Sequence, residues 1–251
     1  MLHLVELELG FPEGTQSHDS MGSILQGALM EIVSPEVAAM LHVEGVRPYS
    51  QYVYFDKLHR RTLWRIGTLA ERAFEAIAEP VLSYGDELYL KNRGYAVTIK
   101  SKRVKKECSY ASLYRKAFES PDVPSGVDIS FLTPTSFKHA GHYEILPDIR
   151  RIFQSLLLRW NEFTSAMELP AGNLEAELAQ ACYIVQYELH SQIFSVDGKR
   201  LIGFGGTMRL RFGKNELANR LMGLLMGFAP FAGIGIKTAV GMGAVETKLL
   251  K

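Results

Sequence analysis

The segment GIGIKTAVGMG (residues 233–243) decides how the chain completes its fold, because it joins the last helical stretch to the last strand-forming stretch. It holds four glycines, one lysine and one threonine in eleven residues. The sequence before it, NELANRLMGLLMGFA (residues 215–229), has helical apolar spacing, with Asn215 as the expected N-cap. The sequence after it, GAVETKLL (residues 243–250), is typical of a strand. So many glycines favour either a tight turn or a close approach of the backbone to a ligand.

The strands and helices expected before this segment, in the second half of the chain, follow the order of a known domain type. VDISFLTPTSF (residues 127–137) predicts a strand, and PDIRRIFQSLLLRWNEFTSA (residues 147–166) predicts a helix that opens on Pro147. YIVQYELHSQIFSVDGKRLIGFGGTMRLRF (residues 183–212) predicts a hairpin whose turn is Asp197-Gly198. The resulting order, β-α-β-β-α-β, is that of a ferredoxin-like domain.

The first half predicts the same order. LHLVELEL (residues 2–9) alternates like a half-buried strand, and residues 20–42 read as helical, with Ser34 capping a short helix that begins at Pro35. YSQYVYFD (residues 49–56) and RTLWRIGTL (residues 61–69) predict paired strands. AERAFEAIAE (residues 70–79) predicts a helix stopped by Pro80, and DELYLKNRGYAVTIKSKRV (residues 86–104) predicts a returning strand. We therefore expect an α+β protein with two tandem ferredoxin-like domains, residues 1–122 and 123–251, divided within ESPDVPSG (residues 119–126).

Composition limits the function classes. Lys plus Arg number 28 against 27 for Asp plus Glu. The overall charge is therefore nearly balanced and does not indicate a nucleic-acid partner. Two distant cysteines without a CxxC motif fit a reducing compartment and offer no metal framework. The N-terminal sequence does not have the pattern of a signal peptide, and the longest apolar stretch is short and interrupted by glycine. We expect a cytoplasmic protein with no membrane partner.

The glycine segment does not match the nucleotide-binding motifs. A phosphate-binding loop needs GxxxxGK[ST] between a strand and a helix, whereas Ile236 separates Gly235 from Lys237 here and the order is helix, loop, strand. The GxGxxG pattern fails because Thr238 takes the third glycine position. A nucleotide-dependent enzyme is disfavoured, and no cofactor is expected.

A polynucleotide backbone remains a candidate ligand, beside a plain structural turn. Glycine N–H groups, Lys237 and Thr238 could all donate to phosphate oxygens. KSKRVKKECSYASLYRK (residues 100–116) interleaves cations with Tyr110 and Tyr114, a pattern that suits phosphates and unpaired bases but also occurs on a solvated strand face. RLRFGK (residues 209–214) and the Arg150-Arg151 pair add weaker donors.

These motifs resemble a known family. FAPFAGIGIKTAVGMGAVE (residues 228–246) is similar to the C-terminal signature of the CRISPR-associated repeat-RNA endoribonucleases of the Cas-six family, in the repeat-associated mysterious protein superfamily. LQGALMEIVSPEVAAMLHVEGVRPYSQYVYF (residues 25–55) and GKRLIGFGGTMRL (residues 198–210) resemble its helix-to-strand segment and its central hairpin. The resemblance implies two ferredoxin-like domains, a basic cleft for RNA, and metal-independent cleavage of precursor CRISPR RNA within the repeat.

The resemblance also implies site residues. The family's catalytic histidine matches His42, and a basic residue shortly after it matches Arg47. Some members add a tyrosine where this chain has Met30, so His18, Ser20 and Tyr49 stand as unranked substitutes. The expected RNA-binding residues are Gly233, Gly235, Lys237, Thr238, Gly241 and Gly243 in the loop, and Lys102, Arg103, Lys105, Lys106 and Arg115 in the basic stretch.

Elementary chemistry fits these roles. Metal-free cleavage uses the 2′-hydroxyl as nucleophile and gives a 2′,3′-cyclic phosphate and a 5′-hydroxyl. A histidine can transfer the proton, whereas an arginine is permanently charged and suits charge stabilisation. The competing interpretation of His42 is a surface residue that closes a helix.

Other function assignments remain open at this stage. A non-catalytic repeat-RNA-binding subunit of a CRISPR effector complex is the alternative to the endoribonuclease, and a homodimer is possible. His139 and His142 are expected in a polar loop and not in a metal site, because no cysteine is near. His190 is expected to be structural, and Met222 and Met226 to pack in the core.

Overall fold

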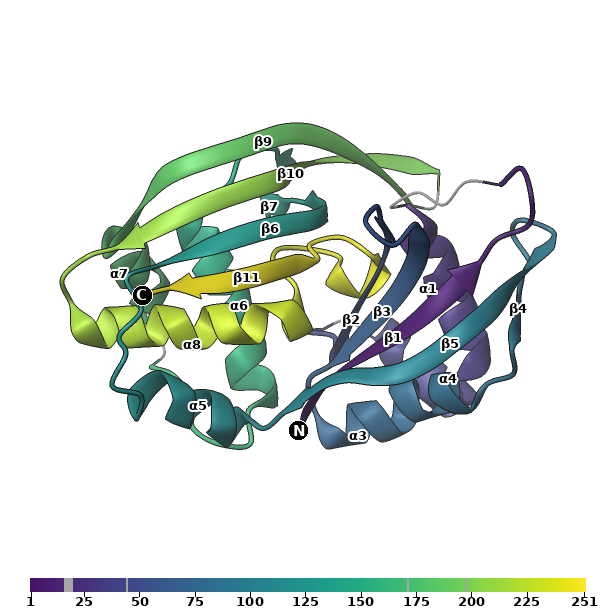
Figure 1. Cartoon of the computed structure of the whole chain (residues 1–251), viewed down its shortest axis with the longest axis horizontal. Coiled ribbons are helices and arrows are strands. Elements are labelled where there is room, and N and C mark those ends of the chain that lie inside the picture. The colour runs from purple at the N-terminus through teal and green to yellow at the C-terminus, as the bar shows by residue number, and fades with distance from the viewer. Residues whose placement is uncertain (16–19, 44, 171, 197) are drawn as a thin grey trace.

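The chain folds into two antiparallel sheets that lie side by side, each with helices packed against it (Figure 1). The computed structural model describes residues 1–15, 20–43, 45–170, 172–196 and 198–251. Strand order is β2-β3-β1-β5-β4 in the first sheet and β11-β6-β10-β9 in the second, with a separate β7-β8 pair. In each large sheet the first strand of its half lies between the third strand and the last, which is the ferredoxin-like arrangement. The α+β prediction of two ferredoxin-like units is confirmed.

The first half contains the predicted elements and one additional strand. Ser34 caps α2 as expected, accepting a hydrogen bond from the Val37 N–H at 3.3 Å. The stretch predicted as one returning strand is a hairpin, β4 and β5, which widens the sheet to five strands. The bounds are β1 Leu2–Gly10, α1 Met21–Ile32, α2 Pro35–His42, β2 Tyr49–Asp56, β3 Arg61–Thr68, α3 Glu71–Ala73, α4 Glu79–Ser83, β4 Glu87–Leu90 and β5 Tyr95–Cys108.

The helix predicted to stop at Pro80 continues to Ser83, so that prediction was wrong. A π-helical turn, Phe74–Ala78, lies immediately before the proline, and the Glu79 N–H bonds the Phe74 carbonyl five residues back. A wider turn shifts the hydrogen-bond pattern just where proline lacks an N–H. The chain therefore keeps its helical direction past Pro80.

The second half contains the predicted elements with shifted ends, and also helices α5 and α7 and the β7–β8 pair, which were not predicted. Helix α6 begins at Ile149, capped by Asp148, and not at Pro147. Asn215 caps α8 as predicted, and Met222 and Met226 are fully buried in its core face. The β9–β10 hairpin is present, although Asp197 of its expected turn lies outside the described residues. The bounds are α5 Tyr110–Phe118, β6 Gly126–Thr135, β7 Phe137–His139, β8 His142–Glu144, α6 Ile149–Phe163, α7 Leu174–Gln180, β9 Cys182–Val196, β10 Lys199–Phe212, α8 Glu216–Ala232, a 3₁₀ turn Thr238–Val240 and β11 Val245–Leu250.

The glycine loop, residues 233–243, fixes the junction between the two sheets, and Figure 1 shows it in yellow beside β2 and β3. Gly241 touches Gly22 at the start of α1. A Cβ added to Gly22 would lie 2.8 Å from the Gly241 Cα, and one added to Gly241 would lie 2.9 Å from the Gly22 Cα. Neither position has room for a side chain, so this close contact requires glycine on both sides.

A buried amide holds the same junction. Gln51 on β2 is fully buried, and its Nε2 donates to the carbonyls of Gly22 at 2.8 Å and Ala239 at 3.2 Å. The Trp64 indole N–H donates to Gln51 Oε1 at 2.8 Å, so this amide is satisfied on both sides. These hydrogen bonds of Gln51 link the first sheet, α1 and the glycine loop. Loss of any of them would leave a buried polar group unpaired, which costs stability.

Strand β1 is more deeply buried than its alternating sequence predicted. Glu6 is only 3 % exposed, because Arg65 on β3 and the side chains of β5 and β11 cover it. Arg65 donates to Glu6 at 2.7 Å and to Glu246 of β11 at 2.9 Å, linking the two halves. Burial opposes ionisation of Glu6, but the hydrogen bonds from Arg103 and Arg65 outweigh it and hold the pKa of Glu6 below its usual value.

Residues from both halves contribute to one hydrophobic cluster. Tyr110 and Leu113 of α5 belong to the same hydrophobic cluster as α8, and Leu2 and Leu4 of β1 join it. The division into domains of residues 1–122 and 123–251 remains a proposal.

No helix among the described residues is both long and apolar enough to cross a bilayer.

We expect Gly22→Ala to destabilise the protein and Gly27→Ala, five residues along the same helix, to stabilise it. A methyl at Gly22 collides with the backbone of the glycine loop, which should lower the free energy of unfolding by about 1–3 kcal/mol. A methyl at Gly27 meets nothing within 4 Å and should add about 0.5–1 kcal/mol. Chemical denaturation of the three proteins measures both changes, and equal stability of the two variants would contradict the glycine–glycine contact.

Candidate active site

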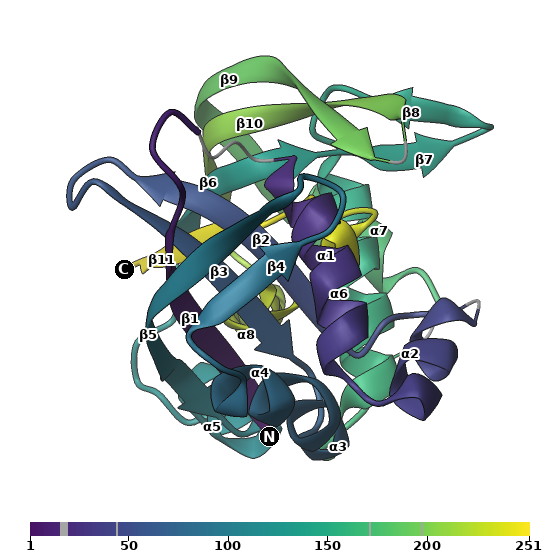
Figure 2. The same cartoon turned by 90° about the vertical axis from the view of Figure 1, so that its right-hand side faces the viewer.

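A pocket of about 620 Å³ lies where the two halves meet. Helices α1 and α2 and the segment after them form one wall, helix α6 forms the facing wall, and the glycine loop and β7 complete it. In Figure 2, α1 lies nearer the viewer than α6, and α2 lies beside them. Elements far apart in the sequence therefore contribute to one concave surface, which is the usual form of a ligand site.

His42 is the only histidine among the described residues that line this pocket, and it is the last residue of α2. Its side chain is exposed, and Nδ1 lies 2.7 Å from the Ala38 carbonyl one turn earlier. A carbonyl oxygen only accepts hydrogen bonds, so Nδ1 carries the hydrogen in this contact. The arrangement fixes the ring and leaves Nε2 available to a ligand.

Arg47 lines the same pocket from the segment between α2 and β2. Its guanidinium donates to the Gly45 carbonyl at 3.2 Å, and no ion pair engages it among the described residues. The two residues that the resemblance assigned to catalysis are thus brought together with the glycine loop.

Lys237 is the one exposed side chain of the glycine loop. Its backbone is in the left-handed region, with φ at 53°, a conformation that is uncommon outside glycine. The loop follows a tight path through positive φ at Gly233, Gly235, Gly241 and Gly243, and this path presents the Lys237 ammonium to the pocket.

The four glycines pack inside the protein, and three of them have N–H groups that are bonded there and not offered to phosphates as expected. All four are buried. The N–H of Gly233 donates to the Ala229 carbonyl, that of Gly235 to Ser155 Oγ, and that of Gly243 to the Pro134 carbonyl. Groups already satisfied inside the protein have nothing to offer a ligand without rearrangement.

Thr238 is also internal, with 3 % of its surface exposed. Its hydroxyl oxygen accepts a hydrogen bond from Arg159 at 3.2 Å. Arg159 also donates to the Gly235 carbonyl at 2.8 Å, so it clamps the loop from α6. Burial lowers the pKa of Arg159 to about 10, which leaves it charged at neutral pH.

The pocket is cationic. Among the described residues that line it there is no aspartate or glutamate, while five permanent cations line it, of which Arg151 alone pairs with carboxylates, those of Glu144 and Asp148. A low-dielectric recess with uncompensated positive charge favours an anionic ligand. The five cations are Arg47, Lys138, Arg151, Arg159 and Lys237.

Sequence reasoning named Arg151 only as a weak donor and missed Lys138 and Arg159. A signal for α6 was present: Arg151, Ser155 and Arg159 recur every fourth residue, which places them on one helix face. No pattern in the sequence pointed to Lys138.

The basic stretch of β5 lies outside this pocket and is partly neutralised. Lys102 pairs with Asp86 at 3.5 Å, Arg103 pairs with Glu6, and Lys105 lies 3.6 Å from Glu6. Lys106 lies over the Phe231 ring, with its ammonium 4.9 Å from the ring centroid, and burial lowers its pKa. Arg115 is exposed on α5.

The aromatic residues of this stretch do not form the expected stacking platform. Tyr110 is 1 % exposed and packs against Trp160 and Phe228, so it is a core residue. Tyr114 stacks on Phe118 at 4.5 Å between ring centroids. Because both tyrosines lie on one helix, Tyr110 points into the core while Tyr114 packs along the helix itself.

None of the described substitutes for the family tyrosine lines the pocket. Tyr49 is 1 % exposed, and burial raises its pKa to about 12, which does not suit proton transfer at neutral pH. Ser20 Oγ accepts from the Ser195 N–H at 3.0 Å, and Met30 packs against the core of the first half. His18 lies outside the described residues.

The other histidines are placed elsewhere. His139 and His142 face each other across the short β7–β8 hairpin. His190 is exposed on β9 and lies 2.9 Å from the Gln192 amide, so it is not a core residue. Among the described residues no group of three or more His, Cys, Asp or Glu side chains could hold a metal ion.

Two ferredoxin-like units thus meet at a cationic pocket with one histidine among its described lining residues. The model of the CRISPR-associated endoribonuclease Cas6 family matches residues 129–245. A CRISPR-associated endoribonuclease Cas6 of Mycobacterium tuberculosis is 32% identical over 250 residues, which cover 97% of this chain and 77% of that protein. The chain belongs to the Cas6 family of CRISPR-associated endoribonucleases.

More distant relatives extend the likeness. A Cas6 of Streptococcus thermophilus is 26% identical over 221 residues, covering 88% of each chain. A solved Cas6 product complex superimposes with a TM-score of 0.80 at 24% identity, covering 99% of this chain and 100% of that one. Thermus thermophilus Cas6 gives a TM-score of 0.71 at 25% identity, covering 99% of this chain and 98% of that one.

We expect Arg159→Ala to loosen the glycine loop locally. The variant loses the donors to the Gly235 carbonyl and to Thr238, so the N–H groups of Gly235 and Ile236 should exchange with solvent about tenfold faster or more. Native-state hydrogen exchange measures this, with the β9–β10 ladder as the internal control. Unchanged exchange at both N–H groups would contradict the clamp.

Proposed function

We propose that the protein cleaves precursor CRISPR RNA within its repeat at this pocket. The observation that carries the proposal is one exposed imidazole among five cations, with no carboxylate among the described lining residues. Phosphodiester cleavage adds negative charge to the phosphate in the transition state, and a cationic surround stabilises that charge. Membership of the Cas6 family supports the choice of CRISPR RNA as substrate.

The reaction that fits these groups is an internal transfer. The ribose 2′-oxygen forms a bond to phosphorus while the bond from phosphorus to the 5′-oxygen breaks. His42 Nε2 donates a proton to the leaving 5′-oxygen, and the 2′-hydroxyl proton passes to water. The products are a 2′,3′-cyclic phosphate and a 5′-hydroxyl.

The position of His42 leaves one ring nitrogen for the substrate. His42 is the last residue of α2 and its Nδ1 is held by the Ala38 carbonyl, so Nε2 is the nitrogen available to the leaving group. Arg47 and Lys237 line the same pocket as cations that stabilise the phosphate, and the permanently charged Arg47 does not transfer protons. No step of this scheme needs a metal ion.

A second candidate function is a repeat-RNA-binding subunit without catalytic activity. It is favoured because no tyrosine and no second histidine occurs among the described residues that line the pocket: Met30 stands at the family tyrosine position, and Tyr49 is buried. Binding of repeat RNA with no product under any buffer would select it over the endoribonuclease.

We expect His42→Ala to reduce cleavage of repeat RNA by about 100-fold or more, because a positioned general acid contributes about 10²–10⁴-fold. Single-turnover cleavage in EDTA measures this, and mapping of the product ends identifies the cyclic phosphate. His142→Ala, at an exposed histidine outside the pocket, is the matched control and should retain the parent rate. Undiminished cleavage by His42→Ala, or loss of parent activity on chelation, would refute the mechanism.

We expect Lys237→Ala to weaken repeat-RNA binding about fivefold or more and to flatten its salt dependence. Removing one phosphate contact should reduce the slope of log K against log salt by about 0.7–0.9. Binding titrations across a salt series test this, with Lys248→Ala, an exposed lysine on β11, as the control for nonspecific charge. If both variants shift the slope equally, Lys237 has no specific role.

A further inference from the structure

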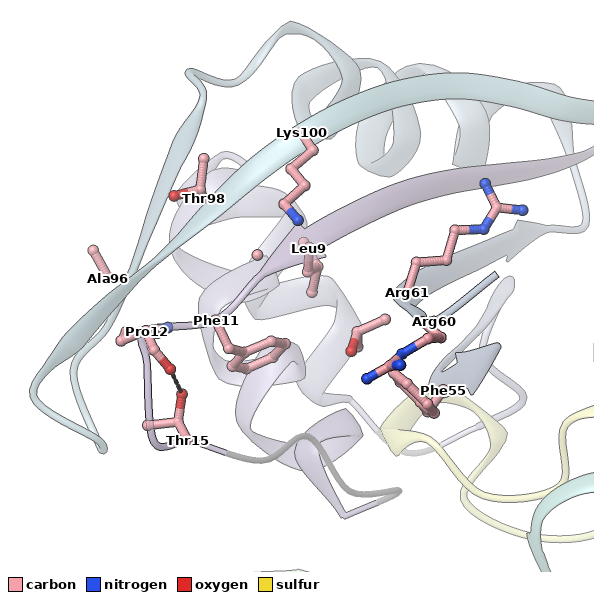
Figure 3. Close-up of a pocket in the computed structure, with 12 residues that line it drawn as sticks. Leu9, Phe11, Pro12, Thr15, Phe55, Arg60, Arg61, Ala96, Thr98 and Lys100 are labelled. Carbon is pink, nitrogen blue, oxygen red and sulfur yellow. Dashed lines mark hydrogen bonds between the residues drawn. The ribbon is translucent and has the colours of Figure 1, made fainter. Parts of the chain in front are cut away.

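A second pocket, of about 760 Å³, lies at the other end of the first sheet and shares no described lining residue with the site of His42. It lies between the end of β1, the β2–β3 hairpin and β5, as the close-up in Figure 3 shows. The proposed cleavage reaction gives this pocket no role. Both aromatic rings and cations line it.

Two phenylalanine rings line this pocket. Phe55, near the end of β2, is 48 % exposed, and Phe11, just after β1, is half-buried. Figure 3 shows the two rings in the pocket at separate positions, contributed by different segments. Exposed rings provide flat surfaces on which an unpaired base can stack, whatever its identity.

Two cations of the pocket have no carboxylate partner within the described part of the chain: Arg60 and Lys100. Arg61, the third cation, is neutralised by Asp56 at 3.2 Å and Glu8 at 3.7 Å. Lys100 lies across Gly10, where an added Cβ would be 2.8 Å from its Cε, so the glycine makes room for the lysine stem. The pocket therefore offers unpaired positive charge beside its rings.

Arg60 shares an unusual feature with Lys237. Positive φ outside glycine occurs at three described residues: Arg60 at 51°, Ala140 at 46° and Lys237 at 53°. Two of the three are cations, and they line this pocket and the pocket of His42. A residue other than glycine is strained in the left-handed region, and such strain is concentrated at binding sites.

Strand β2 connects the two pockets. Arg47 precedes the strand and lines the His42 pocket, while Phe55 lies near its end and lines the second pocket. At about 3.3 Å per residue, the two positions are roughly 25 Å apart along the strand. One nucleotide cannot span this distance, so a strand that occupies both pockets has several linkages between them.

We propose that the Phe11–Phe55 pocket binds an unpaired nucleotide of the same RNA, several linkages from the cleaved one. A base stacks on the phenylalanine rings and a phosphate is held by Arg60 and Lys100. This inference rests on the proposed function for its RNA, and it adds an anchoring site on the opposite end of the first sheet. The site increases affinity for RNA that extends beyond the catalytic pocket and has no part in the chemical step.

The test measures binding of repeat RNA bearing oligouridine extensions of increasing length at either end. All proteins carry His42→Ala so that the RNA stays intact. In this parent, affinity should rise once an extension is long enough to reach the pocket. The double variant Arg60→Gln/Lys100→Gln should lose about tenfold in affinity for the extended RNA, and Phe55→Leu about fivefold, with the unextended repeat bound as by the parent.

Lys57→Gln is the matched control, because Lys57 is exposed in the same hairpin and does not line the pocket. Thermal unfolding of each variant verifies that the hairpin remains folded. Equal affinity of the double variant and the parent for extended RNA would overturn the proposal. So would equal losses for extended and unextended RNA.

The two hypotheses fail in distinguishable ways. If the protein with His42 intact neither binds nor cleaves the repeat, or if the His42→Ala parent still cleaves it, the proposed function is wrong. If the repeat is cleaved and depends on His42, but the extensions bind independently of Arg60, Lys100 and Phe55, only the second site is wrong.

Discussion

The contact between Gly22 and Gly241 is the constraint on which the site depends. Two backbones meet so closely that a methyl on either would overlap the other, and the Gln51 amide bonds both sides of the contact. Helix α1 is thereby held against the glycine loop, and α2, which carries His42, follows α1 directly. The Gly22–Gly241 contact therefore helps to set the position of His42 relative to Lys237, although the two residues are almost two hundred positions apart in the sequence.

The glycines of the loop pack inside the protein and leave one lysine exposed at the pocket. Their positive φ values and buried N–H groups fold residues 233–243 into a compact turn, and only Lys237 extends to the surface. Lys237 itself is held in a left-handed conformation that glycine would adopt at lower cost. The strain is tolerated because Arg159 and the internal hydrogen bonds of the loop over-determine its path.

The charge distribution of the pocket is unfavourable for the free protein and favourable for a polyanion. Arg159 is buried against carbonyl and hydroxyl oxygens without a carboxylate partner among the described residues, and its desolvation lowers its pKa. By contrast, Arg65 is more deeply buried, with 3 % of its surface exposed, and is neutralised by Glu6 and Glu246. One arginine links the two halves of the fold, and the other leaves its charge for a ligand.

The sequence by itself determined the β-α-β-β-α-β core order of each half, the helix caps at Ser34 and Asn215, the core role of Met222 and Met226, and the resemblance that pointed to His42 and Arg47. These follow from local periodicity and from motifs that lie within one segment. Only the tertiary structure decided that β1 is buried on both faces, that the helix continues through Pro80, that Tyr110 is a core residue, and that the loop glycines pack instead of exposing their N–H groups. It also brought Lys138 and Arg159 to the pocket. The physical reason is that burial and charge pairing depend on which distant segments meet, and hydrophobic periodicity along one segment carries no information about its partners.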